Sequence, residues 1–194
     1  VRLSQGLACC VDPEVSQAAL PSSITLHDVL ERDGSADNVV IGVDDRGTVS
    51  CDPVSDGPHM LIAGTTGSGK SEALRALITA VAATQSPDKW QVCLIDAKGG
   101  AGLDIVSDLP HVVGIVTDLD EFGVRDAICG LEVEMRRREQ VLRANGHRDV
   151  STASGLARLL IVIDEFAAVV RADDHARAVL VDIAQRGRSL GMHL

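Results

Sequence analysis

The chain has 194 residues, of which 45% are hydrophobic and 24% charged, a mix typical of globular domains and unlike disordered or collagen-like chains. It carries 18 basic and 28 acidic side chains, a net charge of −10, so it lacks the basic excess usual in proteins that grip duplex DNA. No apolar run approaches the roughly 20 residues that span a bilayer, and no signal peptide is visible. We therefore expect a soluble chain that is not secreted.

The N-terminal part is predicted to be a linker segment, and it holds most of the acidic excess. A short helix is expected over residues 27–31. Two β-branched runs, 39–43 and 48–51, flank an acidic turn that ends in glycine, which is typical of a β-hairpin. A Gly-Pro pair then interrupts the pattern. We accordingly divide the chain into a linker over 1–57 and a domain over 58–194.

In the second part, short apolar runs alternate with longer helical stretches. The expected strands are 60–63, 91–95, 111–116 and 159–163, and the expected helices are 72–83, 125–144 and 176–186. In the helix over 125–144, apolar side chains recur three, four and seven residues apart, and Gly146 follows as a C-terminal cap. The alternation predicts the α/β class, with a mostly parallel sheet covered by helices on both faces.

A glycine-rich loop follows the first expected strand of the domain. Gly64-Thr65-Thr66-Gly67-Ser68-Gly69-Lys70-Ser71 satisfies the pattern G-x-x-x-x-G-K-[ST] in full, and about 0.003 chance matches are expected in a chain of this composition. Such a loop wraps a phosphate with backbone N–H groups, at the positive N-terminal end of a helix. Lys70 would reach the β- and γ-phosphates, and the Ser71 hydroxyl would be a ligand of Mg²⁺. The predicted nucleotide-binding residues are Gly64, Thr65, Thr66, Gly67, Ser68, Gly69, Lys70, Ser71 and Glu72.

Two carboxylates end the apolar run over 159–163. Asp164 would bind Mg²⁺ directly or through water, and Glu165 would orient or deprotonate the water that attacks the γ-phosphate. Alone, the pair could equally be two solvated acids at a strand end. With the loop about 90 residues upstream, the functional interpretation is favoured. Glu165 and Lys70 are thus the candidate catalytic residues, and Ser71 and Asp164 the candidate metal ligands.

Three further groups of residues could carry a function. Asp96-Ala97-Lys98-Gly99-Gly100 follows an expected strand, so Lys98 either approaches the nucleotide or a neighbouring subunit, or is a solvated side chain in a turn. The run over 136–138 is all arginine with glutamates around it, which favours a solvated helix face over a nucleic-acid site.

The five cysteines and the histidines show no metal-ligand spacing. We interpret the cysteines as unpaired, mostly buried thiols of a reducing compartment, and the histidines as structural or solvated.

Several stretches together resemble the FtsK/SpoIIIE family of RecA-like motor ATPases. They run in family order from about residue 57 to the end, which is roughly 70% of the chain. The stretches are 57–72 around the loop, Ile95 to Gly100, Leu109 to Val113, Val116 to Asp118, Glu134 to Arg138, and Arg186 to Leu194. Within the family, the Lys-Gly-Gly after Asp96 is similar to the EccC-type ATPases of type VII secretion, whereas DNA-pumping members more often carry Asp-Pro-Lys.

The resemblance implies a P-loop NTPase that uses ATP and Mg²⁺. It implies a hexameric or chain-of-modules motor at the cytoplasmic face of the membrane, reached through a parent chain or complex. The implied partners are other ATPase modules, a secreted protein substrate and membrane-embedded secretion components, with DNA less expected. Two alternatives stay open: a DNA translocase of the same fold, and an ATP-binding module that regulates assembly without hydrolysis.

The resemblance also carries expectations about the C-terminal part. It expects one more strand with a polar residue, placed between the loop strand and the strand that ends in Asp164. We therefore predict that the domain over 58–194 is C-terminally incomplete. Arg186 and Arg188 are candidates for an arginine that reaches the phosphate of a neighbouring subunit, and Ala97 stands where EccC modules usually have Phe.

Overall fold

The main sheet of the computed structural model contains four parallel strands. The structure describes residues 23–32, 38–97, 102–116, 121–153 and 155–194. The strands are β3 (Trp90–Asp96), β4 (Val112–Val116), β5 (Arg158–Asp164) and β6 (Met192–His193), in the spatial order β4-β3-β5-β6. Each neighbouring pair is parallel, so the predicted parallel sheet is confirmed.

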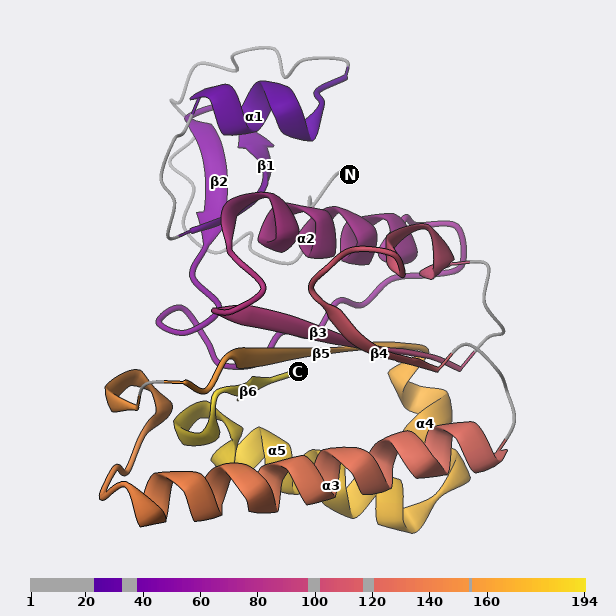
Figure 1. Cartoon of the computed structure of the whole chain (residues 1–194). Coiled ribbons are helices and arrows are strands. Elements are labelled where there is room, and N and C mark those ends of the chain that lie inside the picture. Colours follow the sequence, from indigo (N-terminus) through magenta and orange to yellow (C-terminus); the bar gives the residue numbers. More distant parts are fainter. Residues whose placement is uncertain (1–22, 33–37, 98–101, 117–120, 154) are drawn as a thin grey trace, which may run out of the picture.

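Helices cover both faces of this sheet (Figure 1). One face carries α2 and the short 3₁₀ turn η1; the other carries α3, α4 and α5. Their bounds are α2 Lys70–Thr84, η1 Asp104–Val106, α3 Glu121–Ala144, α4 Phe166–Ala172 and α5 Asp174–Leu190, with a second 3₁₀ turn, η2, at Val150–Thr152. Three of these helices lie where the sequence predicted them, whereas the short α4 was not predicted.

Two hydrophobic cores hold the three layers together, and β5 contributes to both. Because successive side chains of a strand point to opposite faces, Leu160 and Val162 lie in the core below α2, whereas Leu159 and Ile161 lie in the core of α3 and α5. This is why β5 reads as a continuous apolar run. The strand that ends in Asp164 is therefore held from both sides.

The N-terminal part forms a helix and a hairpin beside α2 (Figure 1). Helix α1 spans Leu26–Arg32, and the antiparallel strands β1 (Val39–Asp44) and β2 (Gly47–Cys51) form the predicted hairpin. Val39 is buried in the core that contains α2. The boundary at residues 57 and 58 stays a prediction.

The predicted strand over residues 60–63 is wrong. This segment has no regular secondary structure and belongs to neither sheet. Its first amide, Met60 N, donates to the carbonyl of Leu194 at 2.7 Å, and beyond this contact a cavity separates the segment from β5. A strand assignment needs a partner in a hydrogen-bonded ladder, which the apolar pattern of the sequence cannot reveal.

The interpretation of the arginine run as solvated is wrong for Arg138. Its side chain is 2% exposed. Its Nε donates to Glu134 Oε1 at 2.7 Å, and its Nη1 donates to the Leu190 carbonyl at 2.9 Å. On α3, residue 138 shares a face with buried Leu131, Met135 and Leu142, because their spacings of four and three match the helical period. Arg138 thus joins α3 to the end of α5.

The described cysteines are free thiols, as predicted, but their burial was overestimated. Cys51 and Cys93 are half-buried and Cys129 is exposed. Burial raises the pKa of the Cys93 thiol to about 11, so it remains protonated at neutral pH. Cys9 and Cys10 lie outside the described residues.

Candidate functional site

The glycine-rich loop leads directly into α2 and is exposed. Gly67 and Gly69 have φ values of 76° and 92°, in the left-handed region that favours glycine. A Cβ atom at Gly64 would lie 2.3 Å from Ser68 Oγ, so a larger residue here would force the Ser68 side chain to turn away. The loop therefore turns tightly ahead of the helix N-terminus, the arrangement in which backbone N–H groups and the helix dipole favour an anion.

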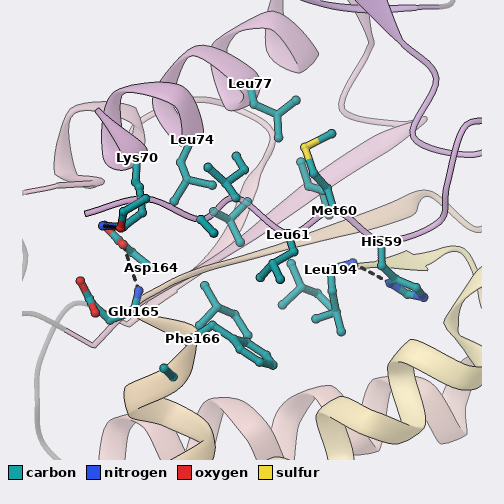
Figure 2. Close-up of a pocket in the computed structure, with 18 residues that line it drawn as sticks. His59, Met60, Leu61, Lys70, Leu74, Leu77, Asp164, Glu165, Phe166 and Leu194 are labelled. Carbon is teal, nitrogen blue, oxygen red and sulfur yellow. Dashed lines mark hydrogen bonds between the residues drawn. The ribbon is translucent and has the colours of Figure 1, made fainter. Parts of the chain in front are cut away.

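Three side chains meet where this loop joins α2. Ser71 Oγ donates to Asp164 Oδ2 at 2.8 Å, across 93 residues of sequence. Lys70 Nζ donates to the carbonyl of Gly64 at 3.1 Å, so the lysine folds over its own loop. Figure 2 shows Lys70, Asp164 and Glu165 together at one end of the cavity that separates β5 from the segment over 60–63. The fold thus brings together the residues predicted as catalytic and metal-binding.

Glu165 occupies an unusual backbone conformation between β5 and α4. Its φ of 60° and ψ of 44° lie in the left-handed region, and it is the one non-glycine residue with positive φ among those described. Its amide donates to Asp164 Oδ1 at 2.9 Å, and its carbonyl accepts from Ala168 N at 2.7 Å. A bulky residue held in this region is strained. Glu165 lies at the same end of the cavity as Lys70 and Asp164 (Figure 2).

Asp96 is a site residue that the sequence analysis did not single out. It ends β3, pairs in register with Asp164 and is 2% exposed. A Cβ atom at Gly102 would lie 3.5 Å from an Oδ2 atom of each aspartate and 3.9 Å from Ser71 Cβ. The two carboxylates and Ser71 therefore surround the small space that glycine leaves free. The available signal was positional, since two adjacent parallel strands both end in aspartate.

A cavity of about 580 Å³ extends from this polar end along β5. Its polar side chains include Lys70, Asp164 and Glu165, and most of the remaining lining is apolar. The apolar lining includes Met60, Leu61, Ile62, Leu74, Leu77, Phe166 and Leu194. The cavity lies between β5 and the segment over 60–63, where the resemblance placed a further strand.

Other predicted residues lie apart from this cluster. Thr65, Thr66 and Ser68 are exposed on the loop, and Glu72 forms an ion pair with Arg75. Lys98 lies outside the described residues. Arg186 forms ion pairs with Asp182 and with Glu139 of α3, and Arg188 is exposed on α5.

The donor set at the polar end suits magnesium. Mg²⁺ is bound in proteins by a few carboxylate and hydroxyl oxygens together with water and substrate phosphates. Ser71 and Asp164 offer such oxygens 2.8 Å apart, and Asp96 adds a second carboxylate at the same place. These residues fit the ion that the sequence analysis expects.

The parallel sheet, with the glycine-rich loop ahead of α2, has the fold of P-loop ATPase domains. More specifically, residues 30–158 match the model of the FtsK/SpoIIIE family, and the chain belongs to this family. This confirms the resemblance seen in the motifs.

Individual relatives show which members of the family the chain resembles. The chain is 40% identical over 154 residues to the ESX-4 secretion system protein EccC4 of Mycobacterium tuberculosis; the match covers 71% of this chain and 12% of the relative. Among solved structures, the cytoplasmic domain of the type VII secretion ATPase EccC of Thermomonospora curvata matches with a TM-score of 0.75 and 35% identity, over 82% of this chain and 21% of that one. The chain therefore spans a minor part of these relatives.

A conjugation protein shares the fold as well. The monomer form of the pCW3 conjugation coupling protein TcpA, solved with ATPγS, matches with a TM-score of 0.60 and 28% identity, over 82% of this chain and 47% of that one.

Among the described helices, none is both long and apolar enough to cross a membrane.

Proposed function

We propose that the chain is an ATP-hydrolysing motor module of a type VII protein secretion system. The observation that carries this proposal is the hydrogen bond between Ser71 and Asp164, which joins the phosphate loop to the acidic strand end. The likeness to EccC4 and to the T. curvata EccC supports secretion as the process. By the same likeness, we propose work at the cytoplasmic face of the membrane, with further ATPase modules in a hexameric assembly, a secreted protein and membrane-embedded components as partners.

Each residue of the polar end has a role in this proposal. The loop amides over 64–71 and Lys70 bind the ATP phosphates. Ser71 and Asp164 hold Mg²⁺, which neutralises charge on the phosphates when bound, and Asp96 supports them. Glu165 orients the attacking water and accepts its proton. Its fixed backbone conformation keeps the carboxylate near the phosphates without further ordering.

The direct test is Glu165→Gln, because glutamine keeps the size of the side chain but cannot accept the proton. We expect the dissociation constant of Mg-ATPγS, measured by calorimetry, to change less than about threefold. ATP turnover in the assembled complex should fall on the order of 10²–10³-fold. Glu31→Gln on the exposed helix α1 is the matched control and should leave both values unchanged.

Three results would contradict the proposal. If folded wild-type chain binds no Mg-ATPγS, the site is not a nucleotide site. If Glu165→Gln hydrolyses ATP at the wild-type rate, the role of Glu165 is wrong. If the wild-type complex binds ATP tightly and does not hydrolyse it, the chain is a nucleotide-dependent assembly module, which is the non-catalytic alternative.

A DNA translocase is the second candidate, and the likeness to the conjugation coupling protein TcpA favours it. The acidic balance of −10 argues against it. The two cargos are separated by adding duplex DNA or a secreted substrate protein to the assembled complex and measuring ATP turnover. We expect stimulation by the protein, and stimulation by DNA alone would favour the second candidate.

A further inference from the structure

His59 lines the end of the cavity opposite Lys70, Asp164 and Glu165, and a second histidine, His193, lies close to it outside the cavity lining. His59 immediately precedes the segment over 60–63, and His193 belongs to β6. His59 Nδ1 accepts a hydrogen bond from Leu194 N at 3.1 Å, and His193 Nδ1 lies 3.0 Å from the carbonyl oxygen of Pro58. Figure 2 shows His59 reaching Leu194 at the end opposite Lys70. Each histidine therefore contacts the backbone of the other's segment.

The partners fix the protonation of both rings. A backbone N–H can only donate, so Nδ1 of His59 is unprotonated and accepts. A carbonyl oxygen can only accept, so Nδ1 of His193 carries the proton and donates. The bond from Met60 N to the Leu194 carbonyl, 2.7 Å long, lies between these two contacts. Three hydrogen bonds thus align residues 58–60 with residues 193–194.

The environment keeps the histidines neutral. His193 is 1% exposed and its ring centroid lies 5.2 Å from that of Trp90. Burial lowers the pKa of His193 to about 4; Arg158 and His59 add to the effect, and the carbonyls of Pro58 and Pro53 oppose it. Burial also lowers the pKa of His59, against the opposing carbonyl of Ala184 in α5. Both rings therefore keep the donor and acceptor arrangement above at neutral pH.

Helix α5 packs against both segments that the histidines join, the one around His59 and β6. A Cβ atom at Gly187 would lie 2.4 Å from the Met192 carbonyl oxygen and 3.4 Å from His59 Cε1. Since the φ of Gly187 is not positive, glycine is required here for space rather than for conformation. The absence of a side chain lets α5 approach both β6 and the ring of His59.

We propose that His59 and His193 are positioning residues that set the place of the phosphate loop. The segment over 60–63 joins His59 to Gly64 and belongs to neither sheet. The hydrogen bonds of the two histidines therefore fix the start of a segment that ends at the nucleotide site. The proposal rests on the proposed function, because it concerns nucleotide affinity at that loop.

The test compares asparagine and glutamine at each histidine. The side-chain amide of asparagine places an oxygen or N–H group near the position of Nδ1, whereas that of glutamine lies nearer to Nε2. His59→Asn can still accept from Leu194 N, and His193→Asn can still donate to the Pro58 carbonyl. The glutamine variants lose these bonds while keeping an uncharged polar side chain.

Two readouts are measured on the whole chain. The first is the dissociation constant of Mg-ATPγS: we expect His59→Gln and His193→Gln to weaken binding about tenfold, and the asparagine variants to stay within about threefold of wild type. The second needs no nucleotide. Amide hydrogen exchange at Leu194 should be about tenfold faster in His59→Gln than in His59→Asn.

The outcomes separate this proposal from the function it rests on. A wild-type chain that is folded but binds no Mg-ATPγS refutes the nucleotide site, while the exchange readout still tests the contact. If the asparagine and glutamine variants of one histidine bind equally well, the positioning role is refuted. If a glutamine variant does not fold, the asparagine variant decides: a folded His59→Asn that binds more than about threefold weaker than wild type refutes the role as well.

Discussion

The two ends of the cavity beside β5 are built in opposite ways. At the loop end, Lys70 and Glu165 are partly exposed charged side chains, and Glu165 lies in a strained backbone conformation. At the histidine end, His59 lines the cavity and the buried, neutral His193 lies beside it, and both rings form hydrogen bonds to the backbone. The side chains of the loop end can exchange their contacts within the protein for contacts with a ligand. The hydrogen bonds of the histidine end hold residues 58–60 against residues 193–194.

This difference follows from what each end must do. Groups that bind phosphate and metal need charge, and charge must stay close to water or to a partner because burying it is costly. A positioning contact needs a single geometry, which neutral buried groups with fixed partners supply. Substitutions at the loop end should therefore change nucleotide binding and turnover, whereas those at the histidine end should also change folding.

The largest effect is expected from Lys70→Ala. Lys70 is the side chain predicted to bind the β- and γ-phosphates of ATP. Alanine removes its charge and its hydrogen bonds to these phosphates. We expect the dissociation constant of Mg-ATPγS to rise on the order of a thousandfold, measured by calorimetry. The midpoint of urea unfolding should stay nearly constant, because Lys70 Nζ contacts the Gly64 carbonyl of an exposed loop. A variant that binds as tightly as wild type would remove Lys70 from the site.

The next effect concerns the pH dependence of stability, which should depend on the histidine end. His193 has a pKa of about 4 in the folded chain, against 6.5 in the unfolded chain. Between these values the unfolded state binds the proton and the folded state does not, so the free energy of unfolding falls as pH drops from 6.5 to 4. The expected loss is about 3 kcal/mol from this group.

Urea unfolding of wild type and His193→Gln at pH 7 and pH 4 measures this term. The variant cannot bind the proton, so its loss of stability on acidification should be smaller by about 3 kcal/mol. His27→Gln, on exposed α1, is the matched control and should behave as wild type. Equal acid sensitivity of wild type and His193→Gln would show that this ring is not a buried neutral group.

How far the sequence predicted these two ends differs as well. The spacing of the loop over 64–71 identified it as a phosphate-binding motif, and the two acids at the end of β5 were interpreted with its help; the fold places Ser71 of the loop beside Asp164. The histidine end joins residues 135 positions apart through ring–backbone hydrogen bonds, which no local pattern encodes. The segment over 60–63, which belongs to neither sheet, and the buried Arg138 were mispredicted because each depends on what lies beside it in space.

A smaller effect is expected from Asp96→Asn, which tests whether the second aspartate belongs to the loop end. Asparagine keeps the shape but removes a charge beside Asp164 and Ser71. We expect the Mg²⁺ concentration that gives half-maximal ATPγS binding to rise about tenfold. Asp108→Asn, at an exposed position, should leave it unchanged. An Asp96→Asn curve that overlies the wild-type curve would assign Asp96 a role in folding only.

The smallest effect concerns the strain at Glu165. A non-glycine residue in the left-handed region costs about 1 kcal/mol, and glycine adopts the same angles freely. We expect Glu165→Gly to have a free energy of unfolding about 1 kcal/mol above that of Glu165→Ala, measured by urea unfolding. Alanine is the matched control because it also lacks the carboxylate but keeps the Cβ atom. If the alanine variant is as stable as the glycine variant, the conformation carries no strain. If glycine is the more stable one and both variants lose turnover, the loop end keeps a strained glutamate because its carboxylate is needed there.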